Sequence, residues 1–488
     1  MKQQHTVRII GQEPVLSVLC QDGQRLDEVL SKNGFPVDHP CGGRGSCQKC
    51  KVLVNGREEL SCQYRIHTDI EVEWNRPSDI YSDDGVTPSA ERRGSQLAFV
   101  LDIGTTTLAL ALVSTQKRIP EKDRVWHLCK ATNPQRIHGA DIMSRIEYCQ
   151  KNADGVKELQ NLLLHKVQSM IRETLDSLGI RESIPRMYAA GNVTMLHLFL
   201  GESPVGIGVY PYTARFLEAK ETDGSLLGFE SVGKVELLPS LATFVGADIV
   251  SGLGWIGLPE PGRYFLLADL GTNAEIALWS DGRLRATAAA AGPCFEGANI
   301  SCGMSALPGA VSSFSLDDSR KPVITTVGNR EPAGICGTGL IDLIASLFRA
   351  GIIDETGYME EPFTVSGPVV LTQADVRQYQ LAKSAVCSAI EVLVKKEGIS
   401  YERIDKVFVS GGFSSGINVK NAVDSGLFPE ALRAKVHSVK NSCLQGLIRF
   451  ACEKNNLSFY IRNGEYVDLS MDDRFNDAFM ENMAFRAL

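Results

Sequence analysis

The sequence predicts a multidomain protein in which a small α+β unit precedes a longer α/β region made of two similar halves. The length of 488 residues suggests roughly three domains. Residues 1–75 hold short β-branched runs around a tight group of cysteines, whereas from residue 97 onward short strands alternate with longer helices. In that later region an apolar strand followed by Asp-x-Gly-Thr occurs twice, at Asp102 and at Asp269. The copies lie about one domain length apart, so we expect two similar half-domains that face each other.

The composition is that of an ordinary globular protein, with 44% apolar and 22% charged residues. A net charge of −8 argues against nucleic acid or an anionic membrane as the main partner. The chain contains no uncharged apolar stretch of about 18 residues, so we expect no membrane-spanning helix. Its first residues lack the apolar core of a signal peptide, and we therefore expect a cytoplasmic protein.

Residues 1–75 carry the pattern of a compact α+β module. Apolar residues at helical spacing from Leu26 predict one helix that ends at Gly34. The segment 76–96 is rich in Pro, Gly, Ser and Asp, cannot pack a core and is expected to be a linker. The expected strands, the first two of them a hairpin, are 6–10, 14–19, 51–54 and 70–73.

The cysteines are the most informative feature of this module. Thirteen cysteines is a high count for a reducing compartment, where disulfides are rare and a tight group more often ligates metal. Four thiolates match the ligand set of a [2Fe-2S] cluster, and their spacing here, C-x5-C-x2-C with a fourth further on, is one residue longer than the plant-type pattern. Structural zinc and inert buried thiols are the alternatives, although zinc sites usually show two C-x2-C knuckles and only one is present. Cys20 lies outside the pattern and is expected in the core. The candidate ligands are Cys41, Cys47, Cys50 and Cys62.

This cysteine loop resembles that of the adrenodoxin-like [2Fe-2S] ferredoxin domains, which share the C-x5-C-x2-C spacing. The resemblance implies a β-grasp fold and a cluster that moves one electron at a time. It does not identify the electron acceptor.

The longer region shows helical periodicity in two places. One helix is expected near 155–178, with Gly179 in the position of a C-terminal cap. A second is expected near 373–396, opening with a capping box formed by Thr372 and Asp375. The two predicted halves are residues 97–260 and residues 261–488, the latter including the C-terminal helices.

The repeated Asp-x-Gly-Thr turn suits phosphate, although a single copy would also fit an ordinary turn. Glycine allows a tight turn whose N–H groups cup anionic oxygens, and threonine hydroxyls add donors. Asp102 and Asp269, at the strand ends, are suited to hold Mg²⁺ through water or to orient an attacking water. The candidate phosphate-binding residues are Gly104, Thr105, Thr106 and Thr107 in the first copy and Gly271, Thr272 and Asn273 in the second.

A third segment, Gly411, Gly412 and Phe413, follows an apolar run further along the chain. The order of the three segments resembles that of the superfamily of actin, sugar kinases and heat-shock ATPases. The resemblance implies two RNase H-like lobes with ATP and Mg²⁺ in the cleft and adenosine against the third segment. Asp248 stands where that superfamily has a connecting helix and a hydrolytic carboxylate; the alternative is a helix N-cap.

Two further segments are secondary candidates. Gly337, Thr338 and Gly339 open an apolar helix, whose N–H groups suit a phosphate or an adenosine edge. The alternative is close helix packing through glycine. Glu296 belongs to a loop that resembles one near the nucleotide, but no other feature of the sequence supports it.

Two competing nucleotide motifs are rejected. Residues 228–235 nearly spell a Walker A loop, but Val235 replaces the Ser or Thr that binds magnesium. Residues 252–257 fit G-x-G-x-x-G, but a Leu-Pro-Glu-Pro run follows where a helix should continue.

From the cysteine loop to the C-terminus the chain resembles the ATP-dependent reductive activators of corrinoid proteins, known as RACE proteins. The resemblance implies one-electron reduction of a Co(II) corrinoid protein to Co(I) in support of a corrinoid-dependent methyltransferase. It implies a [2Fe-2S] cluster, ATP and Mg²⁺ as cofactors. The implied partners are a corrinoid methyl-carrier protein and a low-potential electron donor, which would be a ferredoxin, a flavodoxin or a reductase. The segments that carry it are 191–195, 296–300, 380–383 and 467–470.

Three other functions fit parts of the pattern. An activator of another low-potential metalloenzyme, such as a 2-hydroxyacyl-CoA dehydratase, usually carries a [4Fe-4S] cluster between subunits. A metabolite kinase fits the fold alone and leaves the cysteine loop unexplained. A redox adaptor without enzymatic activity would need a dead ATP site, whereas both aspartates are intact.

Overall fold

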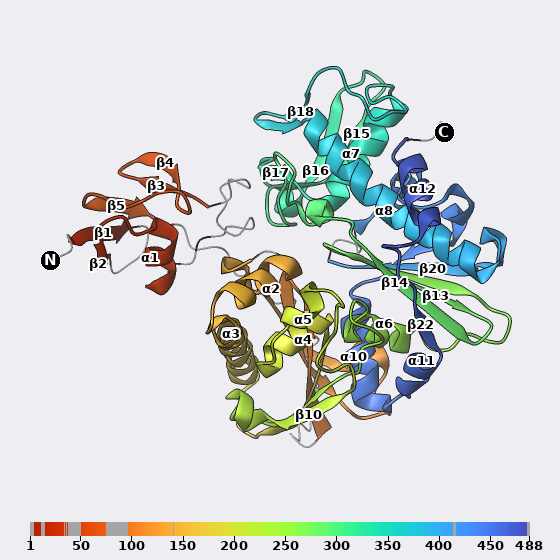
Figure 1. Ribbon diagram of the computed structural model, residues 1–488, viewed down its shortest axis with the longest axis horizontal. Coiled ribbons are helices and arrows are strands. Elements are labelled where there is room, and N and C mark those ends of the chain that lie inside the picture. Colours follow the sequence, from red (N-terminus) through yellow and green to blue (C-terminus); the bar gives the residue numbers. More distant parts are fainter. Residues whose placement is uncertain are drawn as a thin grey trace. The chain divides into compact units, whose positions relative to one another are not determined.

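A computed structural model describes residues 4–10, 15–33, 35, 37, 50–74, 96–139, 141–412 and 416–485 (Figure 1). The chain divides into two compact units, which are described separately below. Unit 1 consists of Met1–Met187, Thr194–Phe216 and Glu221–Val235, and unit 2 of Tyr188–Val193, Leu217–Lys220 and Glu236–Leu488. The predicted boundaries at 75, 96 and 260 stay a prediction.

The N-terminal module of unit 1 is a mixed sheet with strand order β2-β1-β5-β3-β4. One described helix, α1, lies in the chain between β2 and β3. β1 pairs antiparallel with β2 and parallel with β5, which confirms the expected hairpin. Its turn and Gly34 lie outside the described residues. The described elements are β1 (Gln4–Ile10), β2 (Leu16–Gln21), α1 (Leu26–Lys32), β3 (Lys51–Val54), β4 (Arg57–Leu60) and β5 (Ile70–Glu73).

The next sheet, most of whose residues belong to unit 1, has strand order β10-β11-β9-β6-β7-β8. The two strands that come first in the chain, β6 and β7, form an antiparallel hairpin. Their residues are almost all buried and apolar, which explains the continuous apolar runs in this part of the sequence. The strands are β6 (Leu97–Ile103), β7 (Thr107–Ser114), β8 (Val125–Thr132), β9 (Ile184–Gly191), β10 (Lys220–Asp223) and β11 (Val232–Leu237). The helices are α2 (Ile142–Lys151), α3 (Gly155–Ser177), α4 (Val193–Leu200) and α5 (Val205–Gly208).

The sheet of unit 2 repeats this topology. Its strand order is β21-β20-β12-β13-β14-β22. An antiparallel meander (β12, β13, β14) is again followed by strands added beside its first strand (β20, β21), and β22 is an additional strand beside β14. The sequence repeat is therefore also a repeat of topology, as predicted. The strands are β12 (Phe265–Leu270), β13 (Ala274–Ser280), β14 (Arg283–Ala289), β20 (Lys406–Ser410), β21 (Val436–Ser438) and β22 (Gly464–Tyr466).

Helices and smaller sheets complete unit 2 (Figure 1). β16-β15-β17 and β18-β19 form separate small sheets. These strands are β15 (Ala310–Leu316), β16 (Pro322–Thr326), β17 (Gly334–Ile335), β18 (Phe363–Ser366) and β19 (Val369–Leu371). The helices are α6 (Ala247–Ile256), α7 (Gly337–Arg349), α8 (Gln373–Glu397), α9 (Val419–Asp424), α10 (Ser442–Glu453), α11 (Ser458–Arg462) and α12 (Asp473–Glu481).

Both helices predicted from periodicity are confirmed with their end signals. α3 is followed by Gly179 in the left-handed region (φ +65°), where a residue with a Cβ would be strained. α8 begins with a complete capping box, because the Thr372 hydroxyl accepts from the Asp375 amide and the Asp375 carboxylate accepts from the Thr372 amide. The same carboxylate also accepts from the amide of Ser301, and so fixes a neighbouring loop to the start of α8.

The two rejected motifs form no phosphate loop. Lys234 lies in β11 and pairs with Asp223 at 2.9 Å. Residues 252–257 run through the last turns of α6, where glycine serves packing instead. A Cβ at Gly252 would lie 2.7 Å from the Ser442 hydroxyl of α10, and one at Gly446 of α10 would lie 1.9 Å from the Ser251 carbonyl of α6.

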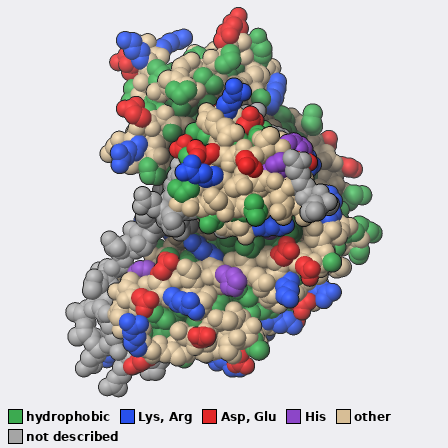
Figure 2. Space-filling model, turned by 90° about the vertical axis from the view of Figure 1, so that its left-hand side faces the viewer, with side chains coloured by type: hydrophobic (Ala, Val, Ile, Leu, Met, Phe, Trp, Pro, Cys, Tyr) green, Lys and Arg blue, Asp and Glu red, His purple; other side chains and the backbone are tan. Residues whose placement is uncertain are grey.

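Two surface findings bear on partners. Among the helices of the described residues, none combines the length and apolar character that crossing a membrane requires. On the face shown in Figure 2, acidic and basic side chains are intermixed, as expected for a chain with 50 basic and 58 acidic residues.

Candidate functional site

Two of the four candidate cluster ligands lie side by side in the N-terminal module. Cys50 directly precedes β3, and Cys62 lies in the turn that follows β4. Both are buried, and their sulfur atoms are 3.2 Å apart. This separation is far longer than the S–S bond of about 2.05 Å in a disulfide and suits two ligands of one metal ion. Cys41 and Cys47 lie outside the described residues.

Burial disfavours the charged form of Cys50. It raises the pKa of Cys50 to about 11, so the thiol is neutral at pH 7 in the metal-free protein. The side-chain amide of Gln63 donates to the Cys62 sulfur at 3.6 Å. The described pair, Cys50 and Cys62, is therefore placed as two ligands of one [2Fe-2S] cluster would be, and the full set of four ligands stays a prediction. Cys20 is buried in the same core and donates to the His5 carbonyl, as expected of a packing residue.

The first Asp-x-Gly-Thr copy is the turn between β6 and β7. Asp102 is the penultimate residue of β6, pairs with Ala109 of β7 and is partly exposed. Residues 104–107, called loop 1 below, close the hairpin. A Cβ at Gly104 would lie 2.5 Å from the Thr107 carbonyl oxygen, so only glycine fits there. Loop 1 is therefore a tight turn at a strand end, as predicted.

The second copy, residues 271–273 or loop 2, is the turn between β12 and β13. The Gly271 amide donates to the Asn273 carbonyl at 2.9 Å. The Thr272 hydroxyl donates to the Glu296 carboxylate at 3.0 Å. Asp269 lies opposite Glu275 in the antiparallel pair, so their side chains share one face of the sheet. Loop 2 is thus bordered by carboxylates.

The segment Gly411–Gly412 lies at the same edge of the sheet as loop 2. β12 and β20 are parallel, with Asp269 beside Ser410, so the loops that follow the two strands emerge together. Gly411 has φ +119°, and a Cβ there would lie 2.0 Å from the Leu270 carbonyl. Phe413 lies outside the described residues.

Asp248 lies in the first turn of α6 and is not its N-cap, which is Gly246. One Asp248 carboxylate oxygen accepts from the Ile249 amide at 2.9 Å. The negative charge of Asp248 acts on both Asp269 and Glu275. The structure therefore brings Asp248 and Asp269 together within unit 2.

The pKa of Asp269 is raised to about 7, first by burial and then by the negative charge of Asp248. A hydrogen bond from Ser410 lowers this pKa and offsets part of the rise. Burial raises the pKa of Glu275 well above its ordinary value, with Asp248 and Asp269 as further causes. A group of neighbouring carboxylates whose negative charges raise one another's pKa is suited to a cation. The sequence interpretation missed Glu275 and left Glu296 unsupported; the hairpin register alone would have placed Glu275 opposite Asp269.

The secondary segment at the start of α7 is packed tightly. Cβ atoms at Gly337 and Gly339 would lie 2.1 Å from the Phe295 carbonyl and 2.0 Å from the Val311 carbonyl. The Thr338 hydroxyl donates to the Ser312 carbonyl at 2.8 Å. Packing therefore accounts for both glycines, and a nucleotide contact of this segment stays a prediction.

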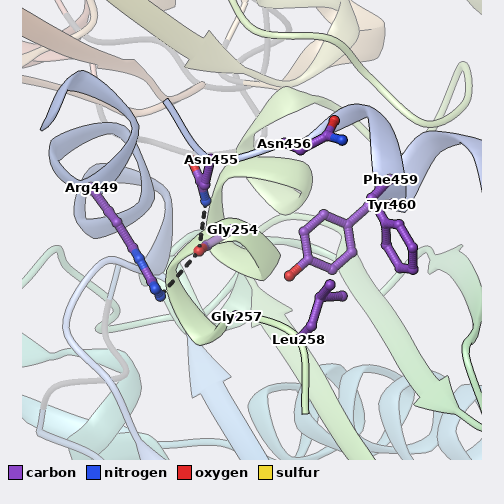
Figure 3. A pocket seen from close by; sticks show the side chains of 8 residues that line it. All are labelled: Gly254, Gly257, Leu258, Arg449, Asn455, Asn456, Phe459 and Tyr460. Carbon is purple, nitrogen blue, oxygen red and sulfur yellow. Dashed lines mark hydrogen bonds between the residues drawn. The ribbon is translucent and has the colours of Figure 1, made fainter. Parts of the chain in front are cut away.

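A pocket of about 290 Å³ lies at the C-terminal end of α6 (Figure 3). Arg449 donates to the Trp255 carbonyl at 2.8 Å, Asn455 to that of Gly254 at 3.0 Å and Tyr460 to that of Leu253 at 2.9 Å. The carbonyls of Gly254 and Trp255 belong to the last turn, where a helix leaves carbonyls without main-chain partners, whereas the Leu253 carbonyl also accepts from the Gly257 amide. The side chains of Arg449, Asn455 and Tyr460 thus hold the C-terminal end of α6, the helix that carries Asp248.

The raised pKa of Asp269 predicts how the stability of the ligand-free protein depends on pH. Between pH 4 and pH 7 the unfolded chain loses this proton while the folded protein keeps it, so folding is progressively penalised; above pH 7 the penalty is complete. A rise of about three pKa units corresponds to a loss of at most about 4 kcal/mol in the free energy of unfolding. We expect Asp269→Asn to stabilise the ligand-free protein by about 1–3 kcal/mol at pH 8 and very little at pH 4, measured by urea unfolding.

Asp405 provides the control of opposite sign. Its pKa is lowered, first by the Tyr264 amide and then by Arg263, so Asp405→Asn should destabilise the protein at pH 8. An Asp269→Asn effect that is the same at pH 4 and pH 8 would contradict the prediction.

Three family models match successive parts of the chain. Residues 12–71 match the 2Fe-2S iron-sulfur cluster binding domain, residues 97–260 the RACo middle region, and residues 263–487 the C-terminal domain of RACo, the ASKHA domain.

Curated relatives and a solved structure agree with these models. The chain is 25% identical to the corrinoid activation enzyme RamQ of Eubacterium limosum, over 94% of this chain and 96% of that protein. It is 23% identical to the [Co(II) methylated amine-specific corrinoid protein] reductase of Methanosarcina barkeri, over 79% of this chain and 76% of that protein. The solved structure of a reductive activator for corrinoid, iron-sulfur protein superposes with a TM-score of 0.72 at 25% identity, covering 99% of this chain and 98% of that chain.

Proposed function

The chain belongs to the RACo family, and from this premise we propose that it is an ATP-dependent reductive activator of a corrinoid protein. It returns the inactive Co(II) corrinoid of a methyl-carrier protein to Co(I), and so supports a corrinoid-dependent methyltransferase. The observation that carries the proposal is the union, in one chain, of a buried cysteine pair in a ferredoxin-type module and two Asp-x-Gly-Thr hairpins. The names of the relatives, which act on corrinoid proteins, support the choice of substrate.

The reaction moves one electron and no atoms. When bound, a [2Fe-2S] cluster supplies one electron at a potential near −400 mV in plant-type centres, and Co(II) as substrate accepts it to become Co(I). Co(II) that carries an axial ligand has a reduction potential below that of the cluster, so the electron transfer is uphill. Each 59 mV of this difference costs about 1.4 kcal/mol. ATP binding or hydrolysis offsets this cost by driving a conformational change that removes the cobalt ligand.

The residues of this chain take distinct parts in that scheme. The ligands of the cluster are Cys41, Cys47, Cys50 and Cys62. Loops 1 and 2 bind the phosphates, and Gly411, Gly412 and Phe413 border the adenosine. Gly337, Thr338 and Gly339 line the same nucleotide from α7. Asp102, Asp248 and Asp269 hold Mg²⁺ or orient water, and Glu275 and Glu296 add negative charge around loop 2.

We further propose that the electron comes from a ferredoxin, a flavodoxin or a reductase of low potential. The 13 cysteines favour the cytoplasm, where thiols stay reduced.

The test mixes the iron-loaded protein with a Co(II) corrinoid protein, a reductant and Mg-ATP, and follows the Co(I) absorbance. Co(I) should form with ATP and not without it. If Co(I) forms at the same rate without ATP, or does not form at all with several corrinoid proteins, the proposal is wrong. A small-molecule kinase would instead show phosphate transfer to a metabolite and no requirement for the cysteines.

A further inference from the structure

Loop 1 rests on a buried polar network that no nucleotide motif of the sequence includes. Asn133 follows β8, and Arg145 belongs to α2; both side chains are fully buried. Burying an arginine is costly unless its donors are all used. The partners of these two residues therefore show what the network is for.

The two residues bind consecutive carbonyl groups of loop 1. The Asn133 side chain donates to the Gly104 carbonyl at 2.9 Å, and Arg145 Nη2 donates to the Thr105 carbonyl at 2.6 Å. The main-chain amide of Asn133 donates to the Thr106 carbonyl at 2.9 Å. Three successive carbonyls are thus drawn toward the same buried side of the loop.

Further hydrogen bonds hold the two residues themselves in place. Arg145 also donates to the Gly139 carbonyl at 2.9 Å and to the Gln135 side-chain oxygen at 3.1 Å. The Gln135 amide donates to the Asn133 side-chain oxygen at 3.0 Å, and the Gln135 side chain donates to the Leu159 carbonyl of α3 at 2.9 Å. The network is consequently tied to both α2 and α3.

Peptide geometry turns this arrangement into an anion site. In a trans peptide the C=O of one residue and the N–H of the next point in opposite directions. Because the carbonyls of Gly104, Thr105 and Thr106 point toward Asn133 and Arg145, the N–H groups of Thr105, Thr106 and Thr107 point to the opposite side. Successive N–H groups on one side of a turn form a concave site for phosphate oxygens. The guanidinium also brings a positive charge to the side of the loop behind these amides.

We propose that Asn133 and Arg145 are positioning residues for the nucleotide phosphates, which hold loop 1 in the conformation that binds an anion. The proposal rests on the proposed function, namely ATP binding. Neither residue touches the nucleotide; both act through the carbonyls of the loop. This assigns a role to the stretch 133–145, which the sequence interpretation left without one.

The test compares the binding of Mg-ATP and of ADP to the iron-loaded full chain and its variants by isothermal titration calorimetry. Arg145→Met should raise the dissociation constant for both nucleotides at least about tenfold. Arg145→Lys keeps the charge and a donor, and should restore binding to within about threefold of the wild type. Asn133→Asp replaces the amide donor by an acceptor that repels the Gly104 carbonyl, and should weaken binding as Arg145→Met does.

Arg124 supplies a matched control. It is a buried arginine of unit 1 that donates from Nε to the Ile119 carbonyl at 3.1 Å, in the connection between β7 and β8 and at the opposite end of β7 from loop 1. Arg124→Met should lower the melting temperature without changing nucleotide affinity. The visible spectrum of the cluster reports whether each variant is loaded with iron, and thermal unfolding followed by circular dichroism reports whether it is folded.

The outcomes separate this inference from the proposed function. If the wild type binds nucleotide and Arg145→Met binds within twofold of it, or Arg124→Met loses as much affinity, the inference is wrong and the proposed function stands. If the wild type itself binds no nucleotide, the inference and the proposed function are both wrong. Should the Arg145 variants not fold, Asn133→Asp decides: a dissociation constant raised at least about tenfold supports the inference, and one within twofold of the wild type overturns it.

Discussion

Replacing Cys62 by alanine is expected to abolish reduction of a Co(II) corrinoid protein, by at least about a thousandfold, while nucleotide binding stays within twofold. The Cys62 sulfur lies 3.2 Å from that of Cys50 in a buried site. On the proposed assignment its loss removes one of four ligands and leaves iron open to solvent and oxidant. The loss is measured as the disappearance of the electron paramagnetic resonance signal of the reduced protein, together with the rate of Co(I) formation.

Cys20→Ala is the matched control for this variant. Cys20 is buried in the same core, 4% exposed against 2% for Cys62, and lies outside the cysteine motif. Both substitutions leave a cavity of the same kind and should cost similar stability. A Cys20→Ala variant that loses the resonance signal as completely as Cys62→Ala would attribute the loss to folding and contradict the ligand assignment.

Asp269→Asn should lower ATP-dependent Co(I) formation by about a hundredfold or more, with the cluster signal unchanged. Asp269 lies beside loop 2, beneath Gly411 and Gly412 at the same sheet edge, and is influenced by Asp248 and Glu296. An amide of the same size keeps the hydrogen bond of Ser410 but cannot offer a negative oxygen to Mg²⁺. ATP titrations at two Mg²⁺ concentrations measure whether the defect lies in metal-nucleotide binding or in turnover.

Asp342→Asn tests whether any buried carboxylate of unit 2 would give the same result. Asp342 is 4% exposed, its pKa is also raised by burial, and it accepts from Asn421 in a packed helix interface. We expect this variant to lose stability and to keep its dependence on ATP. If Asp269→Asn retains activity within about threefold of the wild type, the assignment of Asp269 is wrong.

Local patterns predicted the elements that depend on neighbouring residues. The hairpins at Asp102 and Asp269 and the helices α3 and α8 follow from apolar periodicity, glycine and capping residues within a few positions. β4 was missed because three of its four residues, Arg57 to Glu59, are charged, and an exposed edge strand needs no apolar alternation.

The parts of the site that the sequence did not predict depend on long-range contacts. Asn133 reaches loop 1 only because β8 returns beside β7, and Arg145 only because α2 packs behind the loop. Glu296 approaches Thr272 across 24 positions of sequence. No periodicity records such contacts, since they follow from the packing of whole elements.

The two hairpins share a topology but have surroundings of opposite sign. Donors from an arginine and an asparagine back loop 1, whereas carboxylates border loop 2. Magnesium nucleotide is itself polarised, with anionic oxygens at one place and a divalent cation at another. On the proposed nucleotide role, loop 1 therefore has the surroundings that an anion prefers and loop 2 those that a cation prefers. Because these signs are set by the surrounding side chains and not by the loop residues, exchanging the two loops would leave each environment unchanged.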